Sequence, residues 1–221
     1  DRIAFFRVCS GSYTPGMKVR HLREGREMKI ANALTFMANE RVHMQDAYAG
    51  DIIGIYNHGQ LHIGDTLTEG EKLAFTGIPY FAPELFRSAR ARDPLKGKQL
   101  HQGLKELGEE GAIQVFEGEF GNLMLGAVGQ LQFEIVAQRL ATEYRVDAIY
   151  EACDVATARW LVFPDEKTKK EFCDEQSNRL ARDSEGNLCY MASSIYNLMT
   201  TQKHWPQVEF RTTREQGQKF A

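Results

Sequence analysis

The feature that most constrains the fold is the change in hydrophobic pattern at residues 79–83. Upstream of this segment, short apolar runs separated by glycine turns are typical of antiparallel β-sheets. Downstream of it, the apolar residues alternate between the spacing of strands and the spacing of helices. Pro79 and Pro83 stiffen the segment and lack the backbone N–H that a helix or sheet would use. We therefore predict an α+β chain with two domains, residues 1–82 and 83–221.

The first domain is expected to be an antiparallel β-barrel. Apolar segments of strand length lie at residues 3–8, 52–56 and 73–75, and residues 18–22 alternate basic and apolar side chains. Many short strands with glycine-rich turns favour a small closed barrel. Residues 29–44 are ambiguous, because Leu34 and Phe36 fit either a strand or a short helical turn.

The second domain begins with a pattern typical of a ferredoxin-like α/β sandwich, in the order β-α-β-β-α-β. The expected strands are residues 85–91, 112–116, 123–128 and 146–150. Asp93 and Pro94 start the first helix, because aspartate accepts hydrogen bonds from free N–H groups and proline fits the first helical position. The apolar faces of the two helices are expected to consist of Leu100, Leu104 and Leu107, and of Phe133, Val136, Leu140 and Tyr144.

The rest of the chain is expected to form a C-terminal α/β extension of this domain. Strands are predicted at residues 159–163 and 208–211, and helices at residues 165–178 and 195–203. The polar tail from residue 215 is expected to fray. The sequence shows no internal repeat.

Composition limits the classes of function. The formal net charge is −3 and the pI is near 6.1, so any nucleic-acid contact must be local. The four cysteines form no CxxC pair, which favours free thiols in a reducing cytoplasm. No apolar run is long enough to span a membrane, so we expect a cytoplasmic protein with no membrane partner.

The sequence contains no convincing catalytic or cofactor-binding motif. Gly97 and Lys98 are followed by Gln99 rather than Ser or Thr, which excludes a phosphate-binding P-loop. His58 and His62 would share one face of a strand. A metal site there is left open, although solvated histidines are favoured. We predict no catalytic, cofactor-binding or metal-ligating residue, and no enzymatic activity in this chain.

Two groups of basic residues are candidates for binding RNA phosphates. The first consists of Lys18, Arg20, His21, Arg23, Arg26 and Lys29. The second consists of Arg87, Arg90, Arg92, Lys96 and Lys98. The alternative for both groups is a solvated surface of mixed charge. If the first group lies on an exposed hairpin, replacing Arg20 and Arg23 by alanine should weaken binding without lowering thermal stability.

Several motifs resemble those of translational GTPases. Three segments of the first domain resemble the second domain of these proteins. They are RIAFFRVCSG at residues 2–11, AGDIIG at 49–54 and GDTL at 64–67. Three further segments resemble their ferredoxin-like third domain. They are DPL at residues 93–95, LKELGEE at 104–110 and GAVGQLQFE at 126–134. Three segments resemble the bacterial class II peptide-chain release factors rather than elongation factor G. They are FAPELFR at residues 81–87, EEGAIQVF at 109–116 and ATARW at 156–160.

The resemblance implies a monomeric module that docks on small-subunit RNA and proteins of the ribosome during translation termination. The complete protein would bind GTP or GDP with magnesium through an N-terminal domain absent from this chain, and would promote dissociation of class I release factors. The alternative within the class is a pair of domains from an elongation-factor-G-like or ribosome-protection GTPase. The alternatives outside it are a small-molecule hydrolase using His58 or His62, and a protein-interaction module without RNA contacts.

Overall fold

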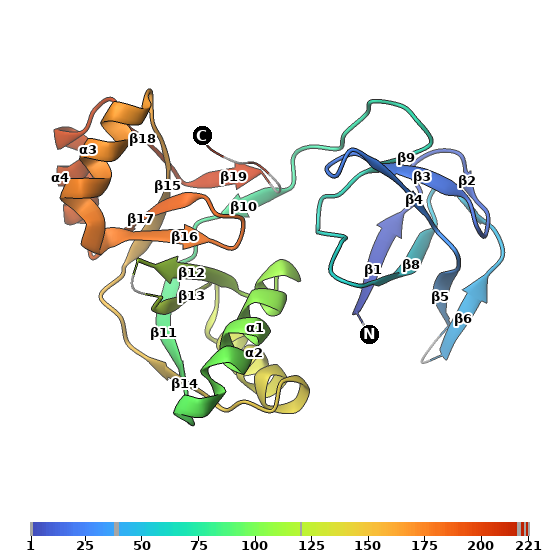
Figure 1. Ribbon diagram of the computed structural model, residues 1–221, viewed down its shortest axis with the longest axis horizontal. Coiled ribbons are helices and arrows are strands. Elements are labelled where there is room, and N and C mark those ends of the chain that lie inside the picture. The colour runs from blue at the N-terminus through green and yellow to red at the C-terminus, as the bar shows by residue number, and fades with distance from the viewer. Residues whose placement is uncertain (1, 38–39, 120, 216–217, 219, 221) are drawn as a thin grey trace. The chain divides into compact units, whose positions relative to one another are not determined.

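The computed structural model describes residues 2–37, 40–119, 121–215, 218 and 220. The chain divides into two compact units, residues 1–77 and 78–221 (Figure 1). The predicted α+β class is confirmed, because strands predominate and are joined by α-helices. Residues 78–82, which the prediction assigned to the first domain, belong to the second unit, where strand β10 (Pro79–Phe81) pairs with β19 (Thr213–Glu215).

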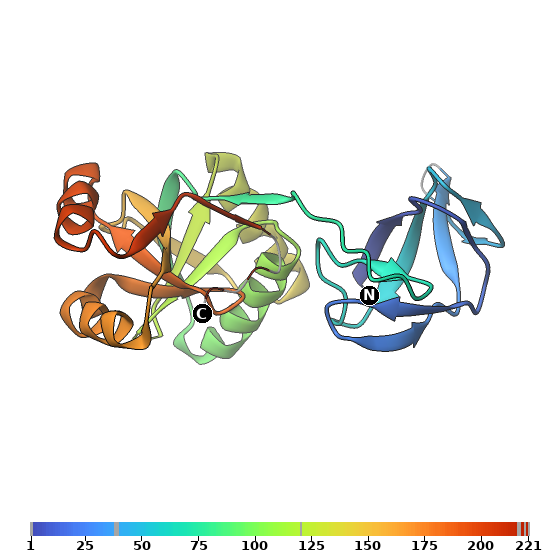
Figure 2. The ribbon, with the colours of Figure 1, turned by 90° about the horizontal axis from the view of Figure 1, so that it is seen from above.

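The first unit consists of strands in separate antiparallel sheets, shown from above in blue and cyan in Figure 2. Four strands, in the order β1-β8-β5-β6, are Arg2–Arg7, Ile52–Asn57, Ala33–Met37 and Glu40–Met44. Three strands, in the order β4-β3-β9, are Arg26–Lys29, Lys18–His21 and Leu67–Thr68. Two strands, β2 and β7, are Ser12–Tyr13 and Ala47–Tyr48. No sheet closes on itself within the described residues, so the predicted closed barrel is not confirmed.

The apolar interior of this unit accounts for its strand pattern. Tyr13, Val19, Ala33, Ile53 and Leu61 are buried together. In the ambiguous segment at residues 29–44, the described residues form the strands β5 and β6 and no helical turn, which settles that alternative. The predicted strand at residues 73–75 is wrong. The backbone there is irregular, and the Phe75 N–H donates to the Thr66 hydroxyl rather than to a neighbouring strand.

The first half of the second unit has the predicted β-α-β-β-α-β order. Its elements are β11 (Leu85–Ala91), α1 (Gly97–Glu109), β12 (Gln114–Gly118), β13 (Leu123–Ala127), α2 (Gln130–Glu143) and β14 (Ala148–Glu151). A short 3₁₀ turn, η1 (Pro94–Lys96), precedes α1, and Asp93 caps it by accepting from the Leu95 N–H at 3.0 Å. The strands lie in the order β14-β11-β13-β12, and every neighbouring pair is antiparallel.

The second half repeats this topology, although the sequence shows no repeat. Its elements are β15 (Thr157–Val162), α3 (Glu166–Gln176), η2 (Ser177–Arg179), β16 (Leu180–Asp183), β17 (Leu188–Ala192), α4 (Ile195–His204) and β18 (Glu209–Arg211). Its strand order, β16-β17-β15-β18, mirrors the first half, and β12 pairs with β16 to make one eight-stranded sheet. The prediction missed β16 and β17, and the expected extension is a second β-α-β-β-α-β unit.

The two faces of this sheet are covered differently. Val115 packs with the helices α1 and α2, whereas Leu180 packs with the cluster around α3 and α4. The β12–β16 register puts these two residues on one side of the sheet, so the helices share that face. The opposite face holds a third cluster around Phe116 and Trp160, partly covered by Tyr80 of β10.

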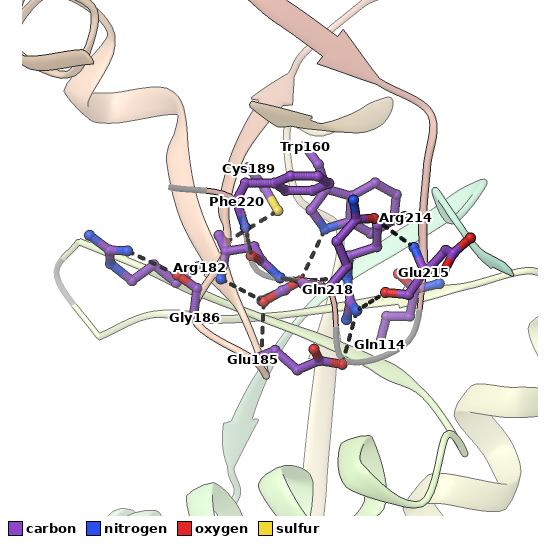
Figure 3. Close-up of polar contacts among 12 residues, drawn as sticks. Gln114, Trp160, Arg182, Glu185, Gly186, Cys189, Arg214, Glu215, Gln218 and Phe220 are labelled. Carbon is purple, nitrogen blue, oxygen red and sulfur yellow. Dashed lines mark hydrogen bonds and ion pairs between the residues drawn. The ribbon is translucent and has the colours of Figure 1, made fainter. Parts of the chain in front are cut away.

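A buried polar network lies beside this third cluster (Figure 3). The guanidinium of Arg214, from β19, is fully buried and lies 2.9 Å from carboxylate oxygens of both Asp183 and Glu185. Asp183 also accepts from the Trp160 indole N–H at 3.0 Å and from the Asn187 N–H at 2.8 Å. The network therefore fastens β19 to the sheet.

Candidate nucleic-acid interface

The strands β3 and β4 form the hairpin that carries the first basic group. Lys18 lies directly opposite Lys29 in the register, and Arg20 lies opposite Glu27. All four are exposed, and residues two apart share one face of a strand. Two like charges directly opposite each other repel, which costs stability. Lys18, Arg20 and Lys29, here called the hairpin cations, therefore give this face an excess of positive charge that an anion would neutralise.

Two members of the first group, the buried His21 and the exposed Arg23, bind a buried carboxylate instead. His21 is 1% exposed, and its Nε2 lies 2.8 Å from Asp65 Oδ2. The Arg23 guanidinium lies 2.7 Å and 3.1 Å from the two Asp65 oxygens, and it also donates to the Gln60 carbonyl at 2.8 Å. Because His21 and Arg23 both contact Asp65, we infer that they hold the hairpin in place against residues 60–65.

The pKa of Asp65 agrees with this structural role. Its burial raises the pKa, but hydrogen bonds from Arg23 and the His62 N–H, together with the charges of Arg23 and His21, outweigh burial. The net result is an Asp65 pKa below its ordinary value, so the carboxylate stays charged where it binds Arg23.

Arg26 lies at the start of β4, opposite His21 in the register. By the alternation of strand residues it belongs to the other face of the hairpin from Lys18 and Arg20, although its side chain is exposed. The structure therefore brings together only three of the six predicted residues on one exposed face.

The second basic group is split by the sheet. Arg87 and Arg90 lie three apart on β11, so they point to opposite faces. Arg87 donates to the Phe86 carbonyl and lies 5.9 Å from the ring centre of Phe133 on α2. Arg90 is paired with Glu151 of β14 at 2.7 Å.

Arg92, Lys96 and Lys98 lie at the turn from β11 into α1. Lys96 Nζ donates to the Arg145 carbonyl at 2.7 Å, and the Arg92 N–H donates to the Asp147 carbonyl at 2.9 Å. These bonds bring the β11–α1 turn beside the turn from α2 into β14. They also place Arg145, which the sequence prediction did not include, next to this basic segment.

The described residues hold no candidate metal centre. Within them, no group of three His, Cys, Asp or Glu side chains could hold a metal ion, and His58 and His62 have no such companions. None of the helices in the described part of the chain is long and apolar enough to cross a membrane.

Comparisons with known proteins define the class of protein and then the family. A model of elongation factor G domain 2 matches residues 1–70, which places the first unit with the domains of translation factors. A model described as class II release factor RF3, C-terminal domain, matches residues 75–202. The chain belongs to the class II release factor RF3 family, as the sequence motifs predicted. Neither matching model is that of a GTPase domain.

One relative and one solved structure indicate how far the match extends. Peptide chain release factor 3 of Aromatoleum aromaticum is 69% identical over all 221 residues, and the chain spans 40% of that relative's length. A crystal structure of a protein from Thermus thermophilus aligns with a TM-score of 0.60 and 22% identity, covering 74% of this chain and 25% of that one. At this identity, the structural match supports the fold alone.

Proposed function

We propose that this chain is the ribosome-docking part of a release factor that acts in translation termination. The observation that carries the proposal is the 69% identity, over the whole chain, to peptide chain release factor 3. In this proposal, the complete protein uses GTP and magnesium to promote dissociation of class I release factors from the ribosome. GTP binding is assigned to the rest of the complete protein. A docking role on ribosomes implies a cytoplasmic protein.

The docking domains are assigned as a barrel-type first domain and a ferredoxin-like second domain with a topologically similar extension, divided at the boundary of the two compact units, near residue 78. An elongation factor G domain 2 also matches the first unit. The release-factor model that matches residues 75–202 favours termination over elongation.

The hairpin cations are the proposed contacts with small-subunit RNA in the first unit. Exposed lysine and arginine side chains neutralise backbone phosphates and release counterions, so binding should weaken as salt is raised. Arg26, Arg87, Arg90, Arg92, Lys96 and Lys98 remain further candidate contacts. His21 and Arg23 support the hairpin instead of contacting RNA.

Sedimentation with purified ribosomal subunits across a salt series tests this proposal. We expect the complete protein to bind the small subunit, with an affinity that falls steeply with salt. Lys18→Ala, Arg20→Ala and Lys29→Ala together should weaken binding and lower the salt slope by about three, one for each phosphate contact.

A matched control removes charge elsewhere. Lys167→Ala with Lys170→Ala changes two exposed lysines of α3 that lie outside both basic groups, and it should leave binding unchanged. Equal binding by the hairpin variant and this control would contradict the assignment of the hairpin cations. Absence of small-subunit binding by the complete protein at low salt would contradict the docking role itself.

A further inference from the structure

Arg145 has an uncommon backbone conformation. Its φ is 56°, in the left-handed region, and every other residue with positive φ in the described part of the chain is a glycine. A side chain in this region is strained because its Cβ crowds the backbone, whereas glycine adopts it freely. Arg145 therefore occupies a position where glycine would stabilise the fold.

The turn that imposes this conformation is fixed by hydrogen bonds. Tyr144 ends α2, and the N–H groups of Tyr144 and Val146 both donate to the Leu140 carbonyl, at 3.2 Å and 3.1 Å. Helices commonly end with a residue in the left-handed conformation, and that residue is usually glycine. Val146 is fully buried, so the chain must turn within one residue. The strain at Arg145 cannot be relieved without moving the core.

The surroundings of Arg145 are rich in cations. The Lys96 ammonium donates to its carbonyl, and the backbone N–H of Arg92 donates to the carbonyl of Asp147, two residues further on. Lys98 follows on the first turn of α1. We call Arg92, Lys96, Lys98 and Arg145 the basic corner.

Few carboxylates balance the basic corner. Asp93 is engaged by the Leu95 N–H at the start of η1, and Asp147 lies in the turn beside Arg145. In the described residues, the side chain of Arg145 makes no hydrogen bond or ion pair with either, or with any other group. Its guanidinium is exposed and therefore contributes nothing to the fold that would offset the backbone strain.

We propose that Arg145 is an RNA-binding residue whose guanidinium contacts a backbone phosphate, together with the other cations of the basic corner. The inference rests on the proposed function, since it takes ribosomal RNA as the ligand. A guanidinium can donate two parallel hydrogen bonds to one phosphate. A strained residue that has no contact within the protein is explained by a contact outside it.

The test uses the complete protein and three substitutions at this position. Arg145→Gly removes both strain and charge, so the melting temperature should rise while small-subunit affinity falls about threefold and the salt slope falls by about one. Arg145→Gln removes only the charge, so affinity should fall without a rise in melting temperature. Arg145→Lys retains the charge and the strain, and it should preserve most of the binding.

A second ligand separates this inference from the proposed function. Binding of a short double-stranded RNA of arbitrary sequence is measured by fluorescence anisotropy for the same variants. If the parent binds small subunits and Arg145→Gly binds subunits and RNA equally well, the RNA-binding role is overturned and the docking function stands. If the parent fails to bind subunits while RNA binding still depends on Arg145, the docking function fails and the role of Arg145 stands. Loss of subunit binding with unchanged RNA binding overturns the role in favour of an acidic protein partner.

Discussion

The Arg214 Nε lies 2.9 Å from Asp183 Oδ2, and neither side chain is more than 3% exposed. The contact is an ion pair whose geometry is not that of a hydrogen bond, and the Arg214 guanidinium also lies over the Tyr80 ring, 4.5 Å from its centre. Burial raises the pKa of Tyr80 to about 12, so its hydroxyl remains protonated at neutral pH. The strand that carries Arg214 is thereby tied both to the sheet and to β10.

Arg214→Met should therefore destabilise the second unit. The change leaves the buried carboxylate of Asp183 without the Arg214 cation, and breaking a buried ion pair in this way costs about 3–5 kcal/mol. The measurement is the free energy of unfolding from urea denaturation. Arg211→Met is the matched control, because Arg211 pairs with Glu209 on β18, where the two side chains are 36% and 56% exposed, and solvent-accessible pairs contribute little. Similar losses in both variants would contradict the role of the buried pair.

Local patterns predicted most of the elements but not how distant elements combine. The face of Leu100, Leu104 and Leu107 was predicted from helical spacing and is buried as expected. β16 was missed because its four residues mix charged and small side chains, and because it pairs with β12, more than sixty residues away. β17 is an apolar run of strand length that the prediction overlooked. The repeated topology was missed because the order of elements repeats while the residues do not.

Arg23→Ala should lower thermal stability, contrary to the expectation from the sequence. Arg23 holds Asp65 and the Gln60 carbonyl, so its loss leaves a buried carboxylate with fewer partners, at a cost of about 1–2 kcal/mol. Thermal unfolding followed by circular dichroism measures the effect. Arg20→Ala is the control, because Arg20 is exposed beside Glu27. An unchanged melting temperature in Arg23→Ala would show that the contacts of Arg23 with Asp65 and Gln60 contribute little to stability.

The candidate site shows the same limit of sequence-based prediction. The cluster of cations was visible, but Arg23 and its partner Asp65 are 42 residues apart, so the sequence could not distinguish a bracing cation from a free one. Arg145 did leave a signal. A helix reaching Tyr144 and a strand beginning at Val146 leave one residue for the turn, which requires a left-handed backbone.

The contacts of Asp65 with His21 and Arg23 should make the stability of the first unit sensitive to acid. The folded-state pKa of Asp65 is lowered, so the stabilisation is fully present above the unfolded-state pKa of about 3.9 and is lost as pH falls through the folded-state value. Asp65→Asn cannot make this charge-dependent contribution. Melting temperatures from pH 6 to pH 3 should fall less steeply below about pH 4 in the variant than in the parent. Parallel curves would contradict the assignment.

Gly126→Ala should destabilise the sheet where β13 passes under Pro83. A Cβ at Gly126 would clash with the Pro83 Cγ and lie 3.0 Å from the Phe116 ring, and neither the proline ring nor the buried phenylalanine can swing away. Overpacking of this kind costs about 1–3 kcal/mol. Gly97→Ala is the matched control, because no atom lies within 4 Å of its Cβ position and its backbone is helical, so alanine should be neutral or slightly stabilising. Urea denaturation of both variants measures the difference, and equal stability would mean that Pro83 shifts freely and that β13 is not held against it.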